Sequence, residues 1–227
     1  MKEKADKLRS KNSFKEAITT YLNSIFFDRN NSETYLGLGI CYKNLGKIKK
    51  AITNLEKSAL LDNENFETFF ELGMCHLNDN MPCKAIKCFV RAVQLEPENP
   101  EAIYQLGIAH EKCDEQDMAL MIYQKLIENS PLFINAYIRK AEILKSMSLY
   151  RQALKYYFDV IRINPNYKNV YSDIGLCFDK LGKHTEAKRY YRKFLISRPD
   201  KTKVNHILNR VEKLKKNNPS KTKLSVI

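Results

Sequence analysis

Apolar residues along the chain recur at intervals of three and four positions, the spacing that places side chains on one face of an α-helix. Tyr35 and Leu38 belong to one such stripe, Ala51 and Leu55 belong to the next, and residues 44–46, Asn-Leu-Gly, separate the two. Asn and Gly adopt the left-handed backbone of a turn more readily than other residues. The pattern therefore predicts a helical hairpin over this stretch, and we expect no strand in the chain.

This hairpin pattern repeats every 34 residues without insertion or deletion. The stretch LGICYKNLGK at residues 38–47 returns as IGLCFDKLGK at residues 174–183, four periods later. We number the positions of each 34-residue unit from Ser32. From that unit onward, the seventh and eighth positions are a large apolar residue and a glycine, except in one unit that has Lys140 and Ala141. The twentieth position is alanine throughout: Ala17, Ala51, Ala85, Ala119, Ala153 and Ala187. A fixed period of this length predicts stacked units in which each contacts only its neighbours.

These spacings resemble the tetratricopeptide repeat, and the resemblance covers residues 1–201. It implies an all-α fold, a right-handed superhelical solenoid of helical hairpins with a C-terminal capping helix, in which first helices line a concave groove. The implied repeats are 1–31 (partial), 32–65, 66–99, 100–133, 134–167 and 168–201. Residues 202–217 resemble the helix that caps such arrays, and we expect residues 218–227 to form a disordered tail.

The sequence contains no signal for membrane insertion, export or catalysis. No apolar run approaches 20 residues, and the lysine-rich start has no signal-peptide core. A cytoplasmic protein is therefore expected. No nucleophile elbow, phosphate-binding glycine loop or metal-binding His-Glu helix is present, so we predict neither an enzyme nor a cofactor.

The cysteines and histidines fit packing positions better than a metal site. Cys41, Cys75 and Cys177 share one repeat position, where small apolar residues pack. His76 lies near Cys75, Cys83 and Cys88 in sequence, but their spacing matches no paired Cys-x-x-Cys zinc motif. His76 and His110 also occupy the position that Tyr42 and Phe178 fill in other units. We therefore predict that both histidines pack inside hairpins and bind no metal.

The net charge of +13 is unevenly distributed. Residues 134–200 hold 14 Lys and Arg against six Asp and Glu, and residues 201–227 hold eight against one. Some of this excess, including Arg189, Arg192 and Lys193, lies on the outer face of a second helix, where a solvated surface is the default expectation. Contact with RNA or an acidic membrane surface is a lesser expectation than protein binding, because no aromatic platform is expected beside these charges.

The resemblance also implies which residues face the groove. The fifth and ninth positions of successive first helices form an apolar ladder, and glutamates at its rim favour a ligand with basic neighbours. The predicted partner-binding residues are Glu33, Leu36, Ile40, Glu67, Phe70, Glu71, Met74, Glu101, Tyr104, Ile108, Ile138 and Arg139. We expect the apolar members to be exposed until a partner covers them.

The function that follows is a non-catalytic scaffold or adaptor that binds an apolar or amphipathic protein segment in the groove. Grooves of the family that bind the acidic C-terminal tails of heat-shock chaperones use Lys, Asn and Arg, whereas the equivalent positions here are Leu36, Ile40, Glu71, Glu101 and Gln105. Such tails are therefore excluded as partners. The alternatives are a secretion-type chaperone that shields apolar segments of a client, and a basic-surface RNA-binding repeat protein.

Overall fold

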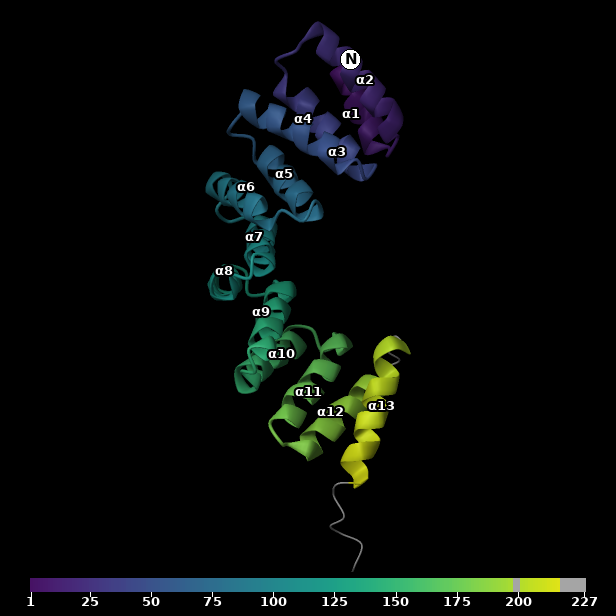
Figure 1. The fold of residues 1–227 in the computed structure, drawn as a ribbon, viewed down its shortest axis with the longest axis vertical. Coiled ribbons are helices and arrows are strands. Elements are labelled where there is room, and N and C mark those ends of the chain that lie inside the picture. The colour runs from purple at the N-terminus through teal and green to yellow at the C-terminus, as the bar shows by residue number, and fades with distance from the viewer. Residues whose placement is uncertain (198–200, 217–227) are drawn as a thin grey trace, which may run out of the picture. The chain divides into compact units, whose positions relative to one another are not determined.

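The structure is a computed structural model that describes residues 1–197 and 201–216, and every regular element in it is a helix (Figure 1). The predicted tail at residues 218–227 lies outside the described residues. The chain divides into two compact units, Met1–Ser130 and Pro131–Ile227.

The first unit consists of four helical hairpins. Its helices are α1 (Lys2–Ser10), α2 (Phe14–Phe27), α3 (Ser32–Asn44), α4 (Ile48–Leu61), α5 (Phe66–Asn78), α6 (Pro82–Leu95), α7 (Pro100–Lys112) and α8 (Gln116–Asn129). Odd-numbered helices are the first helices of their hairpins, and even-numbered helices are the second. Each hairpin packs against the next one along the chain.

The second unit consists of two hairpins followed by one more helix. Its helices are α9 (Ile134–Ser146), α10 (Tyr150–Ile163), the 3₁₀ turn η1 (Lys168–Val170), α11 (Tyr171–Lys180), α12 (His184–Ile196) and α13 (Lys201–Lys216). Over the described residues, the predicted all-α fold without strands is confirmed, with twelve α-helices in six hairpins followed by α13.

Within a hairpin, a glycine on the first helix lies under a large side chain of the second helix. A β-carbon added to Gly107 would lie 2.4 Å from Cε1 of Tyr123, which is too close for any real side chain. The same close approach recurs in three further pairs: Gly39 with Leu55, Gly73 with Phe89, and Gly175 with Tyr191. The absent side chain therefore determines how closely the two helices pack.

All six hairpin turns place one residue in the left-handed backbone region at the fifteenth repeat position. These residues are Asn12, Gly46, Asn80, Asp114, Ser148 and Gly182, with φ between 57° and 73°. Glycine or asparagine, the residue types expected in these turns, holds the position in four of the six hairpins. Aspartate also adopts this conformation more readily than most residues, whereas at Ser148 the tertiary fold imposes a backbone that the residue type does not favour.

Lys140 departs from the repeat pattern and yet is buried, with 9% of its surface exposed. Its ammonium nitrogen lies 4.8 Å from the ring centre of Tyr156 on α10. The aromatic face stabilises the charge, and the aliphatic part of the lysine fills the place of the usual large apolar residue.

Helix α13 covers the last hairpin of the second unit. Ile207, Val211 and Leu214 are buried in a cluster that also contains Tyr191 and Phe194 of α12. The predicted capping role is consistent with this packing, because an uncapped last hairpin would expose the apolar face of α12.

An ion pair also fastens the cap to the last hairpin. The Arg210 guanidinium donates hydrogen bonds of 2.6 and 2.8 Å to the two carboxylate oxygens of Asp179 on α11. This bidentate pairing holds the pKa of Asp179 below its usual range.

Replacement of Gly182 by alanine should lower the free energy of unfolding by about 1 kcal/mol, because φ at this residue is +73° and no neighbouring atom lies within 4 Å of an added β-carbon. Gly182→Asn should cost less, since asparagine already occupies this turn position at Asn12 and Asn80. Urea denaturation of the three proteins measures both differences. Equal losses for alanine and asparagine would contradict the conformational explanation.

Deletion of residues 202–227 should lower the melting temperature and the solubility, because Tyr191 and Phe194 lose their cover. Each of the removed side chains Ile207, Val211 and Leu214 contributes about 1.5–3 kcal/mol of burial. A shorter deletion of residues 218–227 is the control and should leave the melting temperature unchanged. If the longer deletion behaves like the control, α13 is not a cap.

Candidate binding face

The predicted groove residues of the first unit lie on three first helices, and the structure separates them into exposed, half-buried and buried groups. Glu33, Glu67 and Glu101 are exposed at the starts of α3, α5 and α7. Four apolar side chains at the fifth and ninth repeat positions of α5 and α7 are half-buried: Phe70, Met74, Tyr104 and Ile108. We call these four residues the α5–α7 apolar face.

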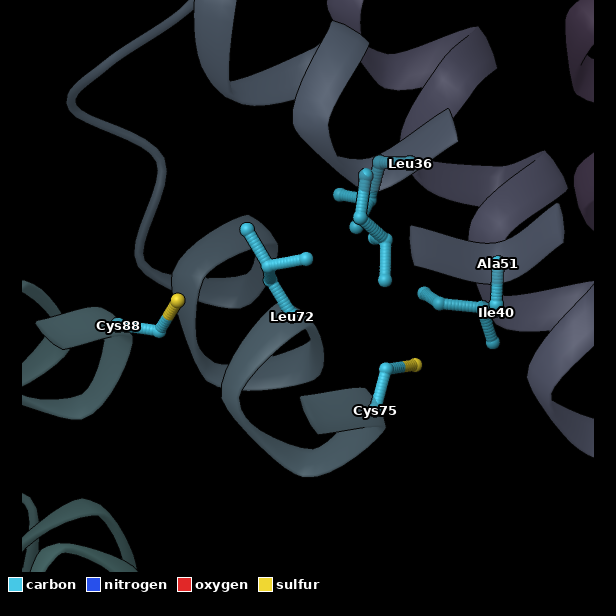
Figure 2. Packing of buried hydrophobic residues seen from close by; sticks show 7 residues of the cluster. Leu36, Ile40, Ala51, Leu72, Cys75 and Cys88 are labelled. Atoms are coloured by element: carbon cyan, nitrogen blue, oxygen red, sulfur yellow. The ribbon is translucent and has the colours of Figure 1, made fainter. Parts of the chain in front are cut away.

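Leu36 and Ile40 correct the sequence prediction, because they are only 6% and 7% exposed. Both belong to a buried cluster with Leu72 and Cys75 of α5 (Figure 2). Their aliphatic side chains fill the space between α3 and α5. The expectation that these two residues wait exposed for a partner is therefore wrong.

The aromatic residues at the equivalent position pack differently. The Phe70 ring lies 5.9 Å from that of Phe89 on α6, and the Tyr104 ring lies 6.0 Å from that of Tyr123 on α8. Each ring thus contacts the second helix of its own hairpin and leaves part of its surface open. Phe70 and Met74 also pack against the buried cluster around Phe89, so they contribute to folding as well.

Ile138 and Arg139 lie on α9, in the second unit, and are described separately for that reason. Both side chains are half-buried. Arg139 forms an ion pair of 3.2 Å with Glu142 one turn further along the same helix.

The glutamates around the apolar face are largely neutralised by the chain itself. Glu33 pairs with Lys2 and Glu71 pairs with Lys43. Glu67 lies 3.8 Å from Arg9, which reaches from α1 to α5, the helices on either side of α3. Glu101 accepts a hydrogen bond of 2.7 Å from Gln105. The expected preference for a basic ligand therefore loses its main support.

One of these ion pairs recurs at the same repeat positions in the second unit. Lys43 and Glu71 occupy the twelfth position of one hairpin and the sixth of the next, and so do Lys145 and Asp173, whose atoms lie 2.5 Å apart. The pair thus joins neighbouring hairpins across their first helices. The second hairpin has Gly37 at the sixth position and no carboxylate there.

The two core histidines are packed as predicted, with His76 4% exposed and His110 8% exposed. Burial lowers the pKa of His76, which favours its neutral form. The Nδ1 atom of His110 lies 2.6 Å from the Glu115 carboxylate. Across the part of the chain that the structure describes, no group of three or more His, Cys, Asp and Glu side chains is arranged to hold a metal ion.

A disulfide between Cys83 and Cys113 joins the first turn of α6 to the end of α7, with the two Cα atoms 6.2 Å apart. The repeat pattern did not predict this crosslink, although Cys83 and Cys113 do not share the repeat position of the packed cysteines. Cys41, Cys75, Cys88 and Cys177 are buried and free. Burial raises the pKa of the Cys41 thiol to about 11 and of the Cys75 thiol to about 12, so these thiols are unreactive.

Consecutive helical hairpins with one repeated packing scheme define a solenoid repeat protein. Across residues 1–197 and 201–216, no helix has the length and apolar character needed to cross a membrane. Models of the tetratricopeptide repeat match residues 32–65, 101–132, 134–167 and 169–201. The crystal structure of MamA is 32% identical over 71% of this chain and 94% of that one, with a TM-score of 0.68. The chain belongs to the tetratricopeptide repeat family.

Two further solved structures share the fold at lower sequence identity. The C-terminal part of a tetratricopeptide repeat protein from Cytophaga hutchinsonii aligns over 96% of this chain and 97% of that one, with 18% identity and a TM-score of 0.78. YrrB, described as a protein of this family with an unusual peptide-binding site, aligns over 83% of this chain and 97% of its own, with 17% identity and a TM-score of 0.69. None of the curated proteins matches the sequence.

The double variant Cys83→Ser/Cys113→Ser should unfold at lower urea concentration than the wild type under oxidising conditions, with a loss of about 2–4 kcal/mol, because the crosslink restricts the unfolded chain. Addition of a reductant should lower the stability of the wild type to that of the variant and leave the variant unchanged. If the reductant has no effect on the wild type, the crosslink does not form in solution.

Proposed function

We propose that this protein is a non-catalytic scaffold or adaptor that binds an apolar or amphipathic segment of another protein on the α5–α7 apolar face. Repeats of this family are typically non-catalytic interaction modules. The observation that supports this assignment is the array of four half-buried apolar side chains, Phe70, Met74, Tyr104 and Ile108, at matched positions of neighbouring first helices.

The spacing of this array suits a helical or extended partner segment. Residues four positions apart lie on one side of a helix, so Phe70 and Met74 form one pair and Tyr104 and Ile108 form a second pair on the next first helix. Apolar side chains of a partner would remove the remaining exposed surface of these residues from water, which is the main source of affinity in such contacts.

The charges around the face support an uncharged or charge-balanced ligand. Glu33, Glu67 and Glu71 already pair with basic residues of the chain. A cationic partner would have to displace those basic residues before it could pair with the glutamates. An acidic tail of the heat-shock chaperone type would find no clamp, since Leu36 and Ile40 are buried and Glu71 carries the wrong charge. We therefore propose an association with little dependence on salt.

The proposed location is the cytoplasm, on the basis of the sequence. The Cys83–Cys113 disulfide is the observation that opposes it, because disulfides persist mainly in oxidising compartments.

The double variant Met74→Gln/Ile108→Gln should lose partner binding and still fold, because glutamine is a good helix former and both side chains are half-exposed. Its melting temperature should fall modestly, since Met74 also packs against the cluster around Phe89. Affinity capture from native lysate, quantified by mass spectrometry, should show partners depleted by about tenfold or more, since each lost apolar contact is worth about 1 kcal/mol or more. Phe70 and Tyr104 are left intact because their rings support α6 and α8.

The matched control is Met118→Gln/Met121→Gln on α8, which removes two exposed apolar side chains from a second helix. It should retain the partners, and the depletion by the first variant should persist at high salt. If the Met74/Ile108 variant is folded, with a cooperative melting transition, and retains every partner, the α5–α7 apolar face is not the binding site.

A further inference from the structure

The second unit carries a large excess of positive charge. Residues 131–227 contain 22 Lys and Arg but only seven Asp and Glu. The first unit, residues 1–130, contains 17 Lys and Arg and 19 Asp and Glu and is nearly balanced. The basic character of the protein therefore resides in one unit.

Ion pairs within the unit occupy most of its described carboxylates. Four of them pair with a nearby basic side chain: Glu142 with Arg139 (3.2 Å), Asp159 with Arg162 (2.7 Å), Asp173 with Lys145 (2.5 Å) and Asp179 with Arg210 (2.6 Å). These pairs use cations of α9, α10 and α13. They leave few carboxylates for the remaining cations.

Five exposed cations on the second helices α10 and α12 have no ion-pair partner among the described residues: Arg151, Lys155, Arg189, Arg192 and Lys193. Lys155 and Arg189 occupy the same repeat position in neighbouring hairpins, so they lie on the same side of the unit. Residues four apart on a helix are separated by about 6 Å along its axis. We call these five residues the α10–α12 basic face.

Aromatic rings lie among these cations, contrary to the expectation from the sequence. Phe158, which is 37% exposed, has its ring centre 5.9 Å from that of Tyr190, and Tyr190 stacks on Phe178 at 5.6 Å. The Lys193 ammonium lies 5.1 Å from the centre of the Tyr190 ring and 5.6 Å from that of Tyr171. The absence of an aromatic platform was the reason to set nucleic acid aside, and that reason no longer holds.

We propose that the α10–α12 basic face binds single-stranded nucleic acid. Arg151, Lys155, Arg189 and Arg192 bind backbone phosphates, and the exposed part of Phe158 contacts a base, the combination that single-strand binding surfaces use. An acidic peptide would pair with the cations, but its carboxylates would make no stacking contact with the exposed part of the Phe158 ring. An anionic bilayer would need several apolar side chains free to insert, whereas the rings here are packed against one another and Ile196 is the one largely exposed apolar side chain of α12.

The first test measures the affinity of the full chain for a short fluorescein-labelled oligouridine by anisotropy over a series of salt concentrations. The variant is Lys155→Gln/Arg189→Gln/Arg192→Gln, and the matched control is Lys49→Gln/Lys57→Gln/Lys87→Gln, which removes three exposed, unpaired cations from the second helices of the first unit. The face variant should bind about tenfold or more weakly. Its slope of log affinity against log salt should fall by about 2, since each phosphate contact on a single strand contributes about 0.7. The control should match the wild type.

The second test addresses the ring and the alternatives. Phe158→Leu should weaken binding by about fivefold without a change in the salt slope, because stacking is lost and the charges remain. Equal losses in the face variant and the control, or a wild type that does not bind oligouridine at low salt, would overturn the proposal. Tighter binding of polyglutamate or of phosphatidylserine vesicles than of oligouridine would also overturn it. The Met74/Ile108 variant should bind oligouridine normally, so this result is independent of the proposed scaffold function.

Discussion

The architecture depends on close packing between the two helices of a hairpin, which in four of the six hairpins places a glycine under a large side chain. Because a methyl group at Gly107 would overlap Tyr123, the two helices hold one separation and one register. A constant register makes equivalent positions of successive repeats fall on the same side of the stack. The ion pairs Lys43–Glu71 and Lys145–Asp173 and the apolar pairs on α5 and α7 all follow from that equivalence.

The fold was predictable from sequence because its determinants are local and repeat. Helix pairs, turn positions and the packed histidines His76 and His110 all follow from spacing within one 34-residue unit. Exposure on the α5–α7 apolar face was less predictable. Leu36 and Phe70 share a repeat position, yet the aliphatic side chain enters the gap between α3 and α5 while the ring packs on its own hairpin. Such differences depend on the particular side chains that meet between hairpins. The repeat pattern does not predict them, because it describes only what all units share.

The ion pairs and the disulfide could not be predicted from the repeat pattern either. Glutamates on the first helices suggest a negative rim when counted alone, but Lys2, Arg9 and Lys43 reach them from preceding helices. The second unit shows the opposite case, in which internal pairs use the carboxylates and leave cations exposed on α10 and α12. The two units thus present different chemistry, apolar and balanced in one and cationic with aromatic rings in the other, from a single repeated scaffold.

The Cys83–Cys113 disulfide changes how the chain would respond to mechanical tension. Its cysteines are 30 residues apart in sequence and 6.2 Å apart in space, so a force applied to the two ends passes through the sulfur atoms. The segment between them, which includes nearly all of α6 and α7, then carries no load. An extended segment of that length spans about 100 Å, and this length stays hidden when the rest of the array is stretched. Half of the α5–α7 apolar face, Tyr104 and Ile108, lies inside the shielded loop.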